Sequence, residues 1–168
     1  MKLTLKKGVL MALSIYLTIT ILVLQFAYHV QKPLSFLQNA VIFMVVAIIT
    51  RQCLTLLVME WKFYKMTEDD WLFVCLLLCR DVLTPMMSVI FINFYVRAKS
   101  AGQKAVVFLV SLVILLALHQ LAITFNLLTY LKWNFFYTIL LNAGFLLTAL
   151  GVFKLISLTL ENRKHESL

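Results

Sequence analysis

Long apolar runs separated by short polar breaks are the dominant pattern of this chain. Five such runs cover residues 8–30, 34–60, 71–96, 105–128 and 133–160. A helix needs about 20 mostly apolar residues to cross the hydrocarbon core of a bilayer, and every run is longer than that. Four glycines and two prolines are the only ones in the chain, which favours regular helices. The pattern predicts an all-α, polytopic transmembrane helical bundle of about five spans, formed by a single domain over 1–168 with no soluble domain.

The composition agrees with a lipid environment. Hydrophobic residues make up 63% of the 168 residues, whereas a soluble domain is about half apolar. A soluble chain of this size has no interior large enough to hide so much apolar side chain. The net charge of +8 comes mainly from lysines and arginines that flank the apolar runs, as is typical of membrane surfaces. We therefore expect the lipid bilayer, and no nucleic acid, as a partner.

The loop 61–70 defines one face of the predicted bundle, here named side A, and the opposite face is side B. All three tryptophans (Trp61, Trp71 and Trp133) fall at side A together with Tyr64 and Tyr130, which predicts an interfacial aromatic belt. Lysines before the first span favour a cytoplasmic N-terminus in the cell membrane, although the basic loop 97–104 and the basic tail, both on side B, argue for the reverse orientation.

The costliest polar side chains of the spans stand at a similar depth. Four of them, on four different spans, lie about nine residues from side A, or about 13–14 Å at 1.5 Å per residue. That depth is close to the middle of a core about 30 Å thick, and two further polar residues adjoin them. The sequence thus predicts a ligand- or partner-binding cluster near the midplane, made of Arg51, Arg80, Asp81, His119, Gln120 and Asn142.

The two charged residues of the third span need partners if that helix is to be stable in lipid. A central charge costs about 2.5–3.5 kcal/mol on insertion scales, so Arg80 and Asp81 together cost about 5–7 kcal/mol. The apolar residues of that span return only about 0.3–0.6 kcal/mol each. Neighbouring residues of a helix do not face each other, so we expect Asp81 to pair with Arg51 of the second span. Arg80 would then be left for His119, Asn142, a main-chain carbonyl or a ligand.

Two further features concern the packing of the helices. Pro85 stands inside the third span, where it is expected to kink the helix, and the hydroxyls of Thr84 and Ser88 are expected to bond the carbonyls that it frees. Gly144, Thr148 and Gly151 form a stripe of small residues on the fifth span. Such a stripe lets helices approach closely, which predicts a packing seam within the chain or, as the alternative, between two copies.

Catalytic chemistry finds little support in the sequence. All three cysteines (Cys53, Cys75 and Cys79) lie inside apolar runs, and no set of cysteines, histidines and carboxylates converges as a metal ion would require. The G-x-S-x-G motif of serine hydrolases does not occur. We therefore predict no catalytic residue, no metal and no cofactor.

Three functional interpretations follow from the polar cluster. The first is a non-enzymatic accessory, sensory or binding subunit, which takes an anionic or amphipathic ligand, a partner membrane protein or a second copy of itself. The second is a small transporter, or a transporter subunit, for an anionic or amphipathic solute. The third is an integral-membrane enzyme that uses the same polar layer. A cluster that only fixes the register of the helices is a further possibility.

Overall fold

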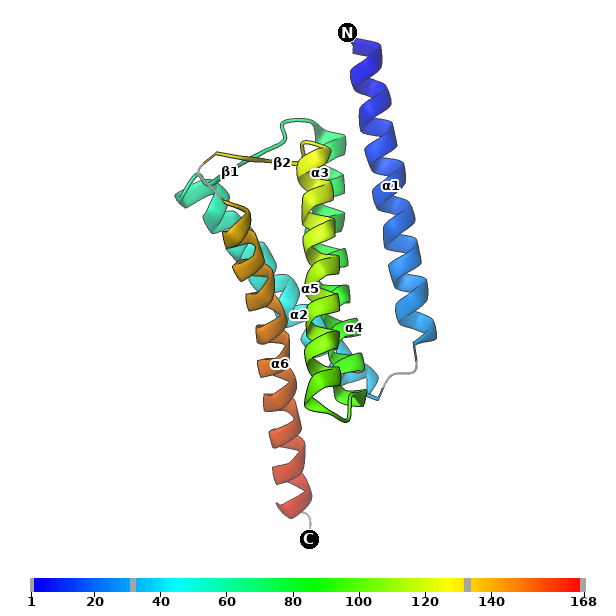
Figure 1. Ribbon diagram of the computed structural model, residues 1–168, viewed down its shortest axis with the longest axis vertical. Coiled ribbons are helices and arrows are strands. Elements are labelled where there is room, and N and C mark those ends of the chain that lie inside the picture. The colour runs from blue at the N-terminus through cyan, green and yellow to red at the C-terminus, as the bar shows by residue number, and fades with distance from the viewer. Residues whose placement is uncertain (1, 31–32, 132–133, 167–168) are drawn as a thin grey trace.

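The protein is a bundle of transmembrane helices, as the pattern of apolar runs predicts. The computed structural model describes residues 2–30, 33–131 and 134–166. Within them, five helical segments are long and apolar enough to cross a membrane: Gly8–His29, Phe36–Glu60, Asp70–Arg97, Ala101–Thr124 and Phe135–Thr159. Successive segments alternate in direction, so the two termini lie at opposite ends of the bundle (Figure 1).

The helices coincide with the predicted spans, although the first helix begins and the last helix ends about six residues beyond them. The first two spans are α1 (Lys2–His29) and α2 (Phe36–Thr55), the latter continued by a π-helical turn η1 (Leu56–Glu60). The third is divided into α3 (Asp70–Leu77), a π-helical turn η2 (Leu78–Leu83) and α4 (Thr84–Arg97). The last two are α5 (Ala101–Thr124) and α6 (Phe135–Glu166), and two short strands, β1 (Tyr64–Met66) and β2 (Leu128–Tyr130), lie in the loops of side A.

Side-chain caps fix where three of the helices begin. Ser35 and Gln38 form a capping box at the start of α2, and Ser100 and Gln103 form another at the start of α5. The carboxylate of Asp69 accepts hydrogen bonds from the first amides of α3. These groups satisfy N–H donors that a helix start would otherwise leave unpaired.

The third span is the centre of the bundle. In its most apolar window 61% of the residues are buried, against 17–22% in the other four spans. Segment α4 packs against α1, α2, α5 and α6, and the first helix leans on α3, η2 and α4. The other helices therefore present most of their apolar surface outward, as contact with lipid requires.

A π-helical turn interrupts this central span just before Pro85. Segment η2 ends at Leu83, and Pro85 lies in the first turn of α4. The hydroxyl of Thr84 donates to the Cys79 carbonyl at 3.0 Å, and that of Ser88 donates to the Thr84 carbonyl at 3.0 Å. Pro85 has no N–H, so it cannot bond the carbonyls of Arg80 or Asp81, which stand one helical turn before it. The hydroxyls of Thr84 and Ser88 bond other carbonyls near the break and not these two.

A two-stranded antiparallel ribbon closes the bundle at side A and was not predicted. Strand β1 pairs with β2, with Tyr64 opposite Tyr130 and Met66 opposite Leu128. Each strand follows a residue with left-handed backbone, Lys62 (φ 51°) and Asn126 (φ 56°). The ribbon ties the loop between the second and third spans to the loop between the fourth and fifth, and it lies across the end of the helices (Figure 1).

The small residues of α6 do not form the expected seam within the chain. Gly144 and Gly151 are exposed, and a side chain added at either would meet no atom within 4 Å. The prediction of an intrachain packing seam is therefore wrong. The stripe faces outward because α6 packs against α2, α4 and α5 through its other sides, with Thr138, Asn142, Leu146 and Ala149 buried there.

Candidate functional site

A cavity of about 60 Å³ lies among the helices, and Tyr64 and Leu128 of the ribbon help to line it. Every span except α1 contributes to its wall. Three of the six predicted site residues line it, Arg80 from η2, His119 from α5 and Asn142 from α6, together with Thr50 of α2 and Tyr64 of β1. The remaining lining is largely leucine, so a few polar groups converge in an apolar surrounding. A cavity of this size holds only a few water-sized groups.

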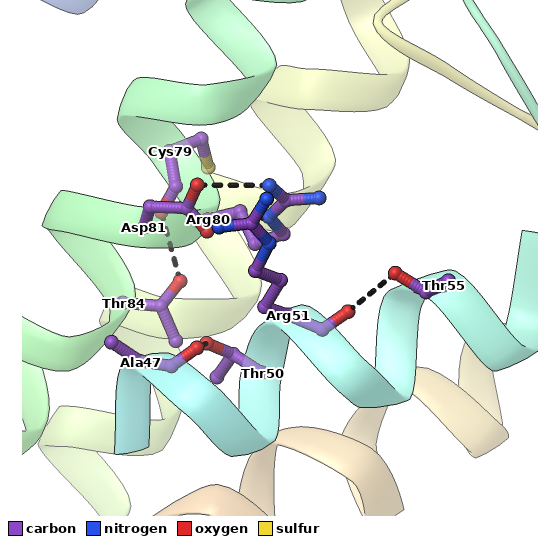
Figure 2. Close-up of polar contacts among 8 residues, drawn as sticks. All are labelled: Ala47, Thr50, Arg51, Thr55, Cys79, Arg80, Asp81 and Thr84. Carbon is purple, nitrogen blue, oxygen red and sulfur yellow. Dashed lines mark hydrogen bonds and ion pairs between the residues drawn. The ribbon is translucent and has the colours of Figure 1, made fainter. Parts of the chain in front are cut away.

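Arg80 forms an ion pair with its own neighbour Asp81. The Arg80 Nε donates to Asp81 Oδ1 at 2.6 Å, and a terminal nitrogen donates to Asp81 Oδ2 at 2.8 Å (Figure 2). The expectation that Asp81 pairs with Arg51 is therefore wrong. Adjacent Cα atoms are only about 3.8 Å apart, and the long arginine stem folds the guanidinium back onto the carboxylate. The Arg80 side chain is 11% exposed and that of Asp81 is 31% exposed.

Arg51 lies close to this pair without joining it. Its side chain extends from α2 toward Arg80 and Asp81 (Figure 2), and α2 packs against η2. Among the described residues Arg51 takes part in no ion pair, and it is exposed. The group of Arg51, Arg80 and Asp81 thus carries one net positive charge.

His119 meets a tyrosine that comes from outside the helices. Tyr64 of β1 is 2% exposed, and its hydroxyl lies 3.4 Å from His119 Nε2 and 3.4 Å from Thr138 Oγ1. The rings of Tyr64 and His119 meet edge to face with centroids 5.9 Å apart. The prediction that Tyr64 belongs to the interfacial belt is wrong, because the pleat of β1 turns it into the bundle and leaves Lys65 outside.

Of the other predicted aromatic and polar residues, some lie where the sequence predicts and Gln120 does not. Trp61 and Trp71 are 60% and 62% exposed, as a belt requires; Trp133 and the side chain of Tyr130 lie outside the described part of the chain. Asn142 is buried and donates to the Thr138 carbonyl at 2.8 Å. Gln120 is exposed and does not line the cavity, because it stands one residue, or about 100°, around α5 from His119.

A second buried polar contact joins α2 to α4 nearer side B. The amide of Asn93 donates to Asn39 Oδ1 at 2.6 Å, and both side chains are buried. Sequence reasoning missed this pair, as it missed Thr50 and Tyr64, although two asparagines in separate apolar runs are a usable signal for a hydrogen bond between spans.

Comparison with protein families, with curated proteins and with solved structures finds no match to this chain. Within the described residues no three histidines, cysteines or carboxylates gather as metal ligands would. The polar groups around the cavity are a guanidinium, an imidazole, a phenol, an amide, a thiol and the hydroxyls of Thr50 and Thr84.

Proposed function

We propose that this protein is a non-enzymatic, multi-pass membrane protein that binds a small anionic solute in the cavity that the ribbon helps to line. The observation that carries the proposal is the convergence of Arg80, His119 and Asn142 from three spans on one interior space. A few convergent polar groups in an otherwise apolar pocket are typical of ligand sites.

Charge decides the class of ligand. Two guanidiniums lie near a single carboxylate, and the uncharged groups of the wall include hydrogen-bond donors. We therefore propose an anion of a few non-hydrogen atoms, such as a small carboxylate. We also propose that the Arg80–Asp81 pair lies in the bilayer interior, where the surrounding hydrocarbon strengthens its attraction for charge.

Ligand-dependent stability tests this function. The protein in lipid nanodiscs would be heated with a panel of small carboxylates and inorganic anions. A ligand at 100 times its Kd stabilises the folded state by about 2.7 kcal/mol, which raises the Tm of a chain of this size by about 5–10 °C. Asn142→Leu, which fills the cavity, should lose the response, whereas Gln120→Leu on the exposed side of α5 should keep it. No response to any anion, or an equal response in both variants, would refute the proposal.

A transporter subunit is the second candidate, favoured by the break in the central span beside the cavity. Transporters place their binding sites at discontinuous helices near the midplane, and η2 together with Pro85 breaks the span next to Arg80. Flux of the identified anion across the membrane of proteoliposomes separates the two functions, because a binding subunit binds the anion but does not carry it across.

Docking of a partner is the third candidate, favoured by the exposed guanidinium of Arg51. An acidic residue on a transmembrane helix of another membrane protein would neutralise it. Arg51→Leu should then abolish co-purification of the partner in mild detergent while leaving the Tm of the isolated protein unchanged.

We further propose that the protein resides in the plasma membrane with its N-terminus in the cytoplasm. The accessibility of an N-terminal tag in intact cells tests this orientation.

A further inference from the structure

A groove of about 570 Å³ lies at side B, where the turn 98–100 joins α4 to α5. Phe94 and Arg97 line it from α4, and Gln103, Val106 and Val107 line it from α5. The groove is open rather than enclosed, so a molecule of the bilayer can enter it from the side. It shares no lining residue with the cavity that Arg80 lines, so the two are separate.

Charged and apolar groups follow one another with depth in this groove. Both α4 and α5 belong to segments that are long and apolar enough to cross a membrane, so the turn between them marks the membrane surface at side B. Arg97 ends α4 at that level, and Phe94 stands three residues further inward, or about 4.5 Å. Val107 stands six residues inward from Ala101, the start of α5, or about 9 Å. The groove thus has a cation at the level of the headgroups and apolar side chains below it.

The charge of Arg97 is not neutralised by any residue that the structure describes. Arg97 takes part in no ion pair there, and its guanidinium carbon lies 5.9 Å from the centre of the Phe94 ring. This contact holds the guanidinium beside an apolar residue of the groove. A guanidinium stacked on a ring still presents N–H groups, which fit the oxygens of a phosphate in pairs.

The other cations of the turn also call for an anion. Residues 97–104 contain Arg97, Lys99 and Lys104 and no acidic residue. Lys104 Nζ lies 5.4 Å from the centre of the Tyr95 ring and forms no ion pair within the described chain. The two ring contacts keep both cations beside the end of α4. Basic residues gathered at a membrane surface attract lipids with a negative headgroup.

We propose that this groove binds a glycerophospholipid with a negatively charged headgroup, such as phosphatidylglycerol. Its phosphate contacts Arg97, and an acyl chain lies along Phe94, Val106 and Val107. The apolar side chains select a lipid over a soluble anion, because a free phosphate would leave them uncovered. The cations select an anionic headgroup, because phosphatidylcholine carries its own cation beside its phosphate.

The test uses the full chain in nanodiscs with equal amounts of dioleoylphosphatidylglycerol and dioleoylphosphatidylcholine, which have the same acyl chains. Native mass spectrometry then measures which lipid stays bound when the bulk lipid is removed. Phosphatidylglycerol should be enriched several-fold over phosphatidylcholine in the retained lipid. Because both leaflets contain both lipids, the result does not depend on the orientation of the chain. Equal retention of the two lipids would overturn the proposal.

Thermal unfolding separates a lipid from a soluble anion. The mixed nanodiscs should raise the Tm by several degrees over nanodiscs of phosphatidylcholine alone. Inorganic phosphate added to the phosphatidylcholine nanodiscs should not raise it, because it has no chain to cover the apolar side chains. An equal rise with inorganic phosphate would assign the groove to a soluble anion and refute a lipid site.

Two pairs of variants locate the site. Arg97→Gln removes the charge of the groove and should lose the preference for phosphatidylglycerol, whereas Lys154→Gln removes an exposed charge of α6 and should keep it. Gly102→Leu keeps every charge but fills part of the groove, where an added side chain meets no atom within 4 Å, and should also lose the preference. Gly8→Leu makes the same change on α1, with equally free space, and should keep it.

Two results with these variants would sink the inference. One is a loss in Lys154→Gln as large as that in Arg97→Gln, because the preference would then follow net charge alone. The other is a Gly102→Leu variant that retains phosphatidylglycerol like the natural protein, because the groove would then not be where the lipid binds.

Discussion

Replacing Asp81 with leucine removes the carboxylate that neutralises Arg80 and leaves the guanidinium in place. The Arg80 side chain is only 11% exposed, so its charge then stands without a counter-charge in a largely dry environment. Breaking a buried ion pair costs about 3–5 kcal/mol, and an unpaired central charge costs about 2.5–3.5 kcal/mol on insertion scales. Because Asp81 is itself 31% exposed, the lower part of these ranges applies, and we expect a loss of about 2–3 kcal/mol.

A double-mutant cycle separates the pair from the individual residues. Arg80→Met removes the charge at similar volume, and the double variant Arg80→Met/Asp81→Leu leaves neither charge behind. We expect the double variant to be more stable than Asp81→Leu alone, with a coupling energy above about 1 kcal/mol. Reversible unfolding in mixed micelles of dodecyl sulfate and a mild detergent gives each free energy of unfolding.

The result that would refute the reasoning is a double variant whose loss equals the sum of the two single losses. The same cycle between Arg51 and Asp81 is the control, because Arg51 forms no ion pair among the described residues. If Asp81 is coupled more strongly to Arg51 than to Arg80, the ion pair between Asp81 and Arg51 that the sequence predicts would be supported instead.

Three further changes test other parts of the bundle by the same unfolding measurement. Tyr64→Phe should cost about 1 kcal/mol, because it removes one hydroxyl that bonds two helices, whereas Trp61→Phe at the exposed surface should cost little; equal losses would contradict a role for the hydroxyl. Asn39→Leu should cost about 1–2 kcal/mol through the loss of its bond to Asn93, and a neutral effect would show that the bond contributes nothing. Gly144→Leu should change the stability of the monomer by less than about 0.5 kcal/mol; an accompanying loss of dimers in cross-linking would assign the stripe to contact between copies, and a large loss of monomer stability would contradict the outward placement.

The spans were predictable because their cause is local. Apolar length alone decides whether a segment can cross a bilayer, and the structural boundaries fall within a few residues of the predicted ones. The fourth span shows a difference that the sequence could have predicted. It begins at Ala101 rather than Ala105, because Ser100 and Gln103 cap it; the S-x-x-Q spacing was available as a signal.

Three of the six residues predicted to share a depth line one cavity, but their depth did not indicate which side chains face inward. Arg80, His119 and Asn142 share a cavity, whereas Gln120 at the same depth is exposed. Depth follows from counting along a helix, but the direction of a side chain depends on how each helix is rotated against its neighbours. With such uniformly apolar spans, the sequence carries little information about that rotation.

The ribbon lay beyond sequence reasoning for a different reason. Strands β1 and β2 have three residues each and are far apart in the chain, so neither shows an alternation long enough to recognise. In the folded bundle the two strands pair across loops that lie more than 60 residues apart in the chain. Tyr64 consequently looked like a surface residue and is instead part of the cavity wall.

The central position of the third span has a consequence for biogenesis. Arg80 and Asp81 emerge from the ribosome before α5 and α6, which complete the walls of the cavity that Arg80 lines. Only α1 and α2 have been made by then, and both contact η2 in the finished bundle. The nascent third helix is poorly suited to release into lipid by itself. It is therefore expected to stay beside these two earlier helices, or within the insertion machinery, until the rest of the chain has been delivered.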